Sequence, residues 1–437
     1  MRAVSRGLDR IDATFDDPNL VANAGLLLVA TLVSRLGLEV LINDRVRLDG
    51  RVGGARPGRK VLTLVHTLVA GHSHIDHVDV LRAGATEAVL GHRVMAPSTV
   101  GTFLRSFTFG HIRQLDAVIA ETIRRVWALG AGPGGDRLVI DIDSTITEVH
   151  GHQKQGASYG YTRQLGYHPL LATRADTGEV LHVRTRKGSA NTQRGAKRFV
   201  EELVARVRRA GATGEVVVRA DSGFYAAKTI TALGTLNVRY SITIPQNQGV
   251  KTAIAGIAED TWVDIVYPDG GAAQVSECRY QNRRLVVRRT RLTGRKQQQL
   301  WPDWRHHAFV TDLTVDKIDA DVFHRHHAVV ELNIRDLKEG AGLEHVPSGH
   351  FQANAAWICC AVLAHNLIRW TAILGATDDH DTGRLVVART LRTQLLAVPG
   401  RLVNRAGTPT LRLPRNWPWA RTFTIALGHL RNLPQTT

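Results

Sequence analysis

Cysteine and long apolar runs are scarce in this sequence of 437 residues. Its three cysteines, Cys278 and the adjacent Cys359 and Cys360, form neither a disulfide framework nor a metal-binding spacing, so we expect core residues in a reducing compartment. The longest largely apolar stretches, 20–33 and 355–363, fall short of the ~20 residues that span a bilayer, which indicates buried helices. Because no apolar leader with a cleavage site opens the chain, the sequence predicts a cytoplasmic protein without a membrane partner.

Acidic residues are also in deficit. The chain has 39 Asp and Glu against 56 Lys and Arg, a formal net charge of +17, while hydrophobic residues make up 43%. That hydrophobic share can form a sizeable core, which excludes wholesale disorder, and the length corresponds to roughly two or three domains. Lys and Arg gain affinity for phosphates by releasing counterions, so the charge predicts a polyanionic partner, nucleic acid before a membrane surface.

Residues 1–134 show helical periodicity, and the glycine-rich segment 130–135 is typical of a linker. Within this part, residues 95–105 place Ser and Thr behind a proline and before an apolar helix. The pattern is typical of the start of a recognition helix in a helix-turn-helix motif, and equally of an ordinary capped helix. In the first interpretation, Arg105 contacts DNA.

From residue 137 the period changes to that of short strands, with two helices among them. The predicted elements, in order, are strands 138–142, 168–173 and 180–185, helix 193–209, strand 215–219, helix 226–233 and strand 240–244. The order β-β-β-α-β-α-β is the ribonuclease H arrangement, whose mixed sheet carries acidic residues at the ends of its first and fourth strands and on a later helix. The predicted fold class is multidomain, α+β and α/β, with a helical N-terminal DNA-binding region before this core.

A β insertion interrupts the core. Short alternating strands in 246–304 indicate the insertion, and a strand at 308–311, a long helix at 319–337 and a buried helix at 355–371 follow it. The sequence assigns no fold to the arginine-rich end. The predicted parts are a DNA-end-binding region, the first part of the core, the β insertion, the second part of the core and a C-terminal dimerisation region, at 1–134, 135–245, 246–304, 305–374 and 375–437.

Three carboxylates are the strongest candidates for chemistry. Asp143 ends the first strand, Asp221 ends the fourth, and Glu331 lies on the late helix. In a ribonuclease H sheet these positions converge, and their hard oxygen atoms would hold two Mg²⁺ ions, or Mn²⁺ in their place, for two-metal cleavage of a phosphodiester. Asp141 shares a strand face with Asp143 and is the second choice as a metal ligand. The alternative is that these acids are ordinary cap and turn residues.

The late helix carries a largely basic stripe around its glutamate. Offsets of 3, 4, 4 and 3 residues align its members, which are His324, His327, Glu331, Arg335 and Lys338. Cations beside a metal-binding carboxylate suit a scissile phosphate, so the four basic residues are predicted to contact DNA. Two alternatives stay open: a solvated face with a Glu331–Arg335 pair, and a Zn²⁺ site made of His324, His327 and Glu331.

A second zinc hypothesis concerns the run His72-Ser-His74-Ile-Asp76-His77, which matches the metal motif of metallo-β-lactamase-like hydrolases. That motif follows a strand and is soon followed by a glycine. Here a helical pattern precedes it and no glycine follows directly, so we favour a helix start with exposed histidines.

Four motifs together resemble the DDE transposases of bacterial insertion sequences, specifically the IS1380 family: Asp141-Ile-Asp143-Ser-Thr, His168-Pro-Leu-Leu, Arg219-Ala-Asp221-Ser-Gly-Phe and Glu331-(6)-Lys338. The resemblance covers most of the chain. It implies a nucleoid-associated cut-and-paste recombinase that cleaves DNA at terminal inverted repeats and transfers the 3′-hydroxyl ends to target DNA, as a homodimer in the synaptic complex. It also implies that the three candidate carboxylates hold the metals and that Lys338 contacts a phosphate at the transposon end.

The sequence departs from the wider group on the late helix, where Tyr-(2)-Arg-(3)-Glu-(6)-Lys becomes His-(2)-His-(3)-Glu-(6)-Lys between residues 324 and 338. Histidine donates to phosphate less reliably at neutral pH. The resemblance further implies an aromatic residue that stacks on a flipped base; Trp304 or Trp301 fits, and the alternative is a tryptophan packed inside the insertion. Two other functions stay open: a ribonuclease H-fold nuclease without strand transfer, and a non-catalytic DNA-binding regulator.

Overall fold

The computed structural model describes residues 11–436 apart from 152, 161–162, 267–270, 292–303 and 377–386. Its N-terminal part is helical, as predicted, apart from the short strand β1 (Leu20–Val21). The helices are α1 (Leu26–Arg35), α2 (Leu38–Arg45), α3 (Pro57–Val69), α4 (Thr86–Leu90), α5 (Pro97–Arg105) and α6 (Phe109–Val126). Helix α5 begins at Pro97 with Ala96 as its N-cap, so the predicted Ser/Thr cap is wrong; proline fits the first turn because its missing N–H has no partner there.

The core is one mixed sheet in which β2, β8 and β9 run parallel, β6 is antiparallel to β2, and β7 is antiparallel to β6. Its strands in spatial order are β7 (Val180–Arg184), β6 (Leu170–Arg174), β2 (Leu138–Ser144), β8 (Val216–Ala220) and β9 (Arg239–Thr243). Helices α7 (Ala196–Ala210) and α8 (Ala227–Thr235) connect the later strands. The predicted order of these elements is confirmed. A small separate sheet of β3 (Thr147–Glu148), β4 (Ser158–Tyr159) and β5 (Leu165–Tyr167) lies between β2 and β6 in the chain.

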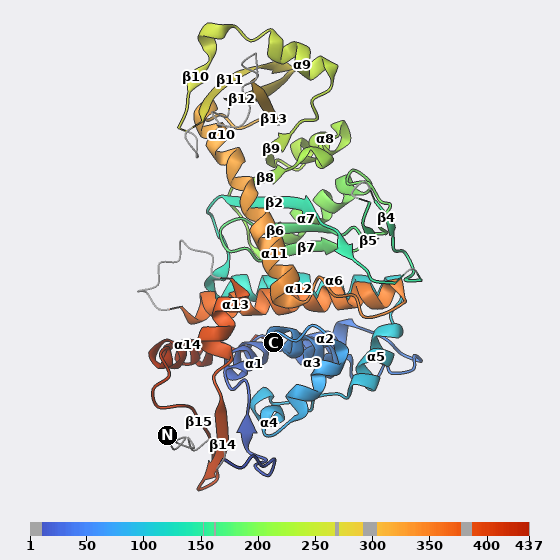
Figure 1. The fold of residues 1–437 in the computed structure, drawn as a ribbon, viewed down its shortest axis with the longest axis vertical. Helices are drawn as coiled ribbons and strands as arrows, with labels where there is room; N and C mark the ends of the chain where they lie inside the picture. Colours follow the sequence, from blue (N-terminus) through green and yellow to red (C-terminus); the bar gives the residue numbers. More distant parts are fainter. Residues whose placement is uncertain are drawn as a thin grey trace, which may run out of the picture.

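The inserted strands extend this same sheet. Strand β13 (Arg305–Thr311) pairs antiparallel with β9, and beyond it lie β12 (Arg283–Arg291), β11 (Ala272–Tyr280) and β10 (Val263–Asp264), which makes nine strands in all. An additional helix, α9 (Gln248–Ala255), covers β11. Figure 1 shows this extension at the end of the molecule opposite the N-terminal helices.

The prediction of a single long helix at 319–337 is wrong. The chain forms α10 (Lys317–Arg325), a 3₁₀ turn at His326–Ala328 and then α11 (Val329–Ala341). A 3₁₀ turn has about three residues per turn where an α-helix has about 3.6, so it rotates the residues before it relative to those after it. The predicted straight stripe of basic residues is therefore broken between residues 324 and 331.

Helix α12 (Phe351–Gly375) lies in the middle of the molecule and packs on α3, α6 and α14 (Ala420–Asn432) (Figure 1). It is apolar and long enough to cross a membrane, yet 83% of its most apolar window is buried inside the protein. Both of its cysteines, Cys359 and Cys360, are buried and free, as predicted. One hydrophobic core runs through the N-terminal helices, the sheet and α12, so the glycine-rich segment 130–135 divides the sequence without dividing the core.

The C-terminal part contains α13 (Ala388–Leu391), the hairpin β14 (Gly400–Arg405) and β15 (Thr408–Arg412), and α14. Strand β14 pairs with β1, and α14 packs on α1 and α12. This region therefore joins the first helices of the chain, a long-range pairing that the sequence pattern did not predict.

Candidate active site

Two parallel strands bring acidic residues to one edge of the sheet. Strands β2 and β8 pair in a register that sets Asp141 opposite Arg219 and Ile142 opposite Ala220. Continued by one residue, this register brings Asp143, near the end of β2, opposite Asp221, the first residue after β8. The predicted neighbourhood of these two aspartates is thus built by strand pairing alone.

Asp143 and Asp221 are mostly buried and carry charges that disfavour each other. Asp143 accepts a hydrogen bond of 2.6 Å from the backbone N–H of Ser144, and Asp221 accepts one of 3.0 Å from that of Gly223. Burial, together with the neighbouring charges of Asp221 and Glu331, raises the pKa of Asp143 to about 6. Burial also raises the pKa of Asp221. The site therefore concentrates negative charge that the protein compensates incompletely.

Glu331 and Lys338 bring α11 into this electrostatic neighbourhood. Glu331 lies exposed in the first turn of α11, and its charge acts on Asp143. Lys338 lies seven residues further along; burial lowers its pKa, while the charges of Glu344, Asp143 and Glu148 oppose that change. The three predicted carboxylates and the predicted lysine are thus electrostatic neighbours.

Asp141, the second choice as a metal ligand, belongs to an ion-pair network. Its side chain is fully buried, and its two oxygens accept hydrogen bonds of 2.8 Å each from Arg219. His327 Nδ1 lies 2.8 Å from one of these oxygens. Arg219 also donates to the carbonyl of Phe323, which ties β8 to α10. The sequence motif contains Arg219 but did not predict its role, although its place two residues before Asp221 mirrors that of Asp141 before Asp143.

His324 does not reach the surface, so its predicted contact with DNA is wrong. The residue is 3% exposed, and its ring stacks on Phe309 with centroids 4.0 Å apart. Its two ring nitrogens lie 2.8 and 3.0 Å from the hydroxyls of Ser241 and Thr243. Burial lowers its pKa well below the ordinary value, which keeps the ring neutral.

Three further residues predicted to contact DNA, His327, Arg335 and Arg105, lie on separate elements of the structure. His327 is 14% exposed and directed at Asp141, so it is a positioning residue in this arrangement. Arg335 is exposed on α11. Arg105 is exposed at the end of α5, where it donates a hydrogen bond of 3.2 Å to Thr102. The zinc site suggested for His324, His327 and Glu331 is not formed, because the two histidines have the partners described above.

Trp304 lies beside a pocket of about 380 Å³ in the extended part of the sheet. The guanidinium of Arg289 lies 4.7 Å from the centre of the Trp304 ring and 4.2 Å from that of Trp262. Arg289 also forms an ion pair of 2.7 Å with Glu259. Trp304 is thus already in contact with a cation, and Trp301 lies outside the described residues.

The histidine run 72–77 does not form a metal site. Helix α3 precedes it, and a 3₁₀ helix begins at Ile75, which agrees with the favoured prediction of a helix start. The rings of His74 and His345 have centroids 4.2 Å apart, and those of His72 and His77 are 5.6 Å apart. In the described part of the chain, no group of three or more His, Cys, Asp or Glu side chains is arranged to hold a metal ion.

The three carboxylates Asp143, Asp221 and Glu331 are electrostatic neighbours, but in the described structure their oxygens are not arranged to coordinate one metal ion. Their donor chemistry nevertheless fits a divalent cation, because carboxylate oxygens are the ligands that Mg²⁺ and Mn²⁺ prefer. The raised pKa of Asp143 supports the same conclusion, since a cation would relieve the mutual repulsion of the acids. Asp143 and Asp221 are the two carboxylates that the strand register brings together.

Two known matches to this chain are transposases. No curated protein matches the sequence. A piggyBac transposase, solved by cryo-EM as a synaptic complex with hairpin DNA, is similar at 12% identity and a TM-score of 0.42, over 86% of this chain and 80% of that one. Residues 5–435 match the family described as "Transposase DDE domain group 1". Because this match spans nearly the whole sequence, the chain belongs to that family of DDE-domain transposases.

Proposed function

We propose that this transposase cuts DNA at the terminal inverted repeats of its element and joins the freed 3′-hydroxyl ends to target DNA. The observation that carries the proposal is the pairing of Asp143 with Asp221 at the ends of two adjacent parallel strands, next to Glu331. DDE transposases generally use divalent metal ions, and here the three carboxylates would hold Mg²⁺, with two ions per site. When bound, these ions supply an activated nucleophile and stabilise the leaving oxygen of the phosphodiester.

Other residues of the chain position the three acids and would neutralise the charge of the bound phosphate. The Arg219–Asp141 pair and His327 fix the strand ends and the start of α11, which sets the relative places of the three acids. Lys338, half-buried near Asp143, provides a fixed positive charge for a phosphate oxygen. Arg335 would add an exposed contact to the backbone of the same DNA strand.

Further parts of the proposal concern the ends of the element. The N-terminal helices, with Arg105 on α5, would read the terminal repeats, and two copies would assemble around two ends through the C-terminal region. Trp304 would stack on a flipped base, provided that Arg289 moves aside or shares the pocket. The motifs around Asp143, Asp221 and Glu331 resemble those of the IS1380 group, and we propose that the chain belongs to it.

The decisive experiment is metal-dependent cleavage and joining of a labelled duplex that carries the element's own ends, with Mg²⁺ or Mn²⁺. Wild type is compared with Asp221→Asn and with the control Asp260→Asn, which removes an exposed carboxylate in the inserted region. We expect joining in wild type and control, and its loss in Asp221→Asn.

The outcomes separate the alternatives. Cleavage without joining of the 3′-hydroxyl ends to a second duplex would identify a nuclease. Binding of the ends without cleavage, unchanged by substitution of the three acids, would identify a DNA-binding regulator. Joining that persists in Asp221→Asn would overturn the proposed site.

A further inference from the structure

A groove of about 710 Å³ lies between α6 and α7, beside the edge strand β7 and away from the carboxylates. Arginines dominate its lining: Arg45, Arg113, Arg124, Arg198, Arg206 and Arg209. Four acidic residues share it, namely Asp116, Glu121, Glu201 and Glu202. The excess of positive charge in the groove is therefore 6 − 4 = +2.

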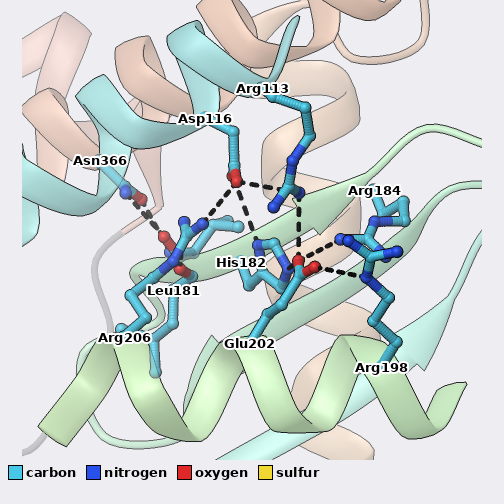
Figure 2. A network of polar contacts seen from close by, with 10 residues as sticks. Arg113, Asp116, Leu181, His182, Arg184, Arg198, Glu202, Arg206 and Asn366 are labelled. Carbon is cyan, nitrogen blue, oxygen red and sulfur yellow. Dashed lines mark hydrogen bonds and ion pairs between the residues drawn. The ribbon is translucent and has the colours of Figure 1, made fainter. Parts of the chain in front are cut away.

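Two carboxylates in the groove accept hydrogen bonds from several arginines (Figure 2). Glu202 on α7 accepts hydrogen bonds from three guanidinium groups, which belong to Arg113, Arg184 and Arg198. Asp116 on α6 accepts one of 2.7 Å from the buried Arg206. Four arginines thus share two carboxylates, which orients the guanidinium groups without neutralising them all.

His182 on β7 lies between the same two carboxylates. Its ring nitrogens are 3.4 Å from Asp116 and 3.3 Å from Glu202, and the ring stacks on Phe199 with centroids 4.5 Å apart. Burial alone would raise the pKa of Asp116. The hydrogen bonds and charges of His182 and Arg206 have the larger combined effect and hold the pKa of that carboxyl below its usual range. Both acids therefore stay ionised near neutral pH and keep the arginines in place.

Two further arginines of the groove have free donors. Arg45 at the end of α2 and Arg209 at the end of α7 are exposed, and among the described residues their side chains form no hydrogen bond or ion pair. Arg113 and Arg198 keep 38% and 75% of their side chains accessible despite their ion pairs. Groups of this kind suit phosphate oxygens, because guanidinium donors match them in geometry and charge.

The groove also leads toward the proposed site. Thr192, just before α7, lies 3.3 Å from the hydroxyl of Ser144, the residue after Asp143. Helix α7 runs away from this contact, and the eleven residue steps from Arg198 to Arg209 cover about 16 Å of its axis. That length corresponds to about five base-pair steps of duplex DNA.

We propose that this groove is a second DNA-binding surface, which holds the phosphate backbone of duplex DNA beyond the segment being cut. The inference rests on the proposed function only in taking DNA as the substrate. Contacts to phosphate carry no sequence information, so the groove would bind flanking or target DNA of any sequence.

The test is the salt dependence of DNA binding by the full-length protein. The variant Arg45→Ala/Arg209→Ala removes the two unpaired arginines and leaves the ion-pair network intact. A matched control, Arg405→Ala/Arg421→Ala, removes two exposed arginines of the C-terminal part that form no side-chain hydrogen bond or ion pair in the described structure. Each lost phosphate contact lowers the slope of log K against log salt by about 0.9, so we expect a slope reduced by about 1.8 and binding about thirtyfold weaker near 0.15 M salt.

Position is tested separately with a DNA-cleaving iron chelate on Ala117→Cys, which lies in the groove, and on Ala406→Cys at the β14–β15 turn, both in a Cys278→Ser background. We expect the first to cut bound duplex at discrete places and the second to leave it intact. An unchanged salt slope in Arg45→Ala/Arg209→Ala, or an absence of cuts from Ala117→Cys, would overturn the proposal; an acidic protein would then be the better partner for the groove. Loss of joining in Asp221→Asn with normal binding tests the catalytic proposal independently of this result.

Discussion

The crowding of acids around Asp143 predicts that the site destabilises the protein when no metal is bound. Burial and the charges of Asp221 and Glu331 raise the pKa of Asp143 to about 6, from an ordinary value of 3.8. The folded state therefore binds a proton more tightly than the unfolded state, so stability falls as the pH rises from about 4 to about 6 and stays lower above that. Asp143→Asn removes the titrating group, and we expect it to stabilise the metal-free protein at pH 8.

The size of the effect follows from the same values. The interval from 3.8 to about 6, at about 1.36 kcal/mol per pH unit, gives up to about 3 kcal/mol. With an unfolding entropy of about 2.1 cal/mol/K per residue, a chain of 437 residues would gain about 3 °C in Tm. Thermal unfolding in EDTA at pH 8, 6 and 4 measures this, and the gain should shrink toward zero near pH 4.

Mg²⁺ provides the second half of the assay. Binding to the folded state alone should stabilise wild type and leave Asp143→Asn almost unchanged, which reverses their order at high metal concentration. Asp260→Asn serves as the control, since its carboxyl is exposed and should leave Tm unchanged at every pH. If Asp143→Asn were no more stable than wild type at pH 8 in EDTA, or equally stabilised at pH 4, the reasoning from burial and like charge would be refuted.

Three further predictions concern the residues around the site. Arg219→Ala leaves Asp141 buried without its arginine partner and with only His327 beside it, so denaturant unfolding should show a loss of about 3 to 5 kcal/mol. His324→Phe should leave DNA affinity within twofold of wild type, because the ring is buried. It should lower the free energy of unfolding by about 1 to 3 kcal/mol, because the hydroxyls of Ser241 and Thr243 lose their partner. A large loss of affinity in a DNA titration would contradict the burial argument. Gly223→Ala would place a Cβ 2.9 Å from the Cβ of Thr192 and 3.1 Å from an oxygen of Asp221, so one of these side chains must shift. Single-turnover assays should show cleavage slowed by about tenfold to a hundredfold without a change in DNA affinity.

Local patterns in the sequence were enough to predict the core. Alternation of apolar residues and turn signals located the strands and helices from residue 137 to residue 244, and the acids at their ends followed from that order. The same patterns did not predict the 3₁₀ turn at His326–Ala328, the small sheet of β3 to β5, or the pairing of β1 with β14. The pairing of β1 with β14 depends on contacts between segments far apart in the chain, which a local period does not contain. The 3₁₀ turn and the strands β3 to β5 are two or three residues long, too short to show a period.

The choice between Asp141 and Asp143 shows where that limit lies. Strand alternation alone makes the two equivalent, because both project from one face of β2. What separates them is the neighbouring strand: the parallel register sets Arg219 opposite Asp141, and two residues further on it brings Asp221 opposite Asp143. The first pair compensates its own charge and is buried, whereas the second concentrates like charge at the sheet edge, where a cation would be bound. An Arg-x-Asp on one strand beside an Asp-x-Asp on the next therefore distinguishes the ion-paired aspartate from the one that faces a second acid, and the sequence predicts this difference once the two strands are aligned in parallel.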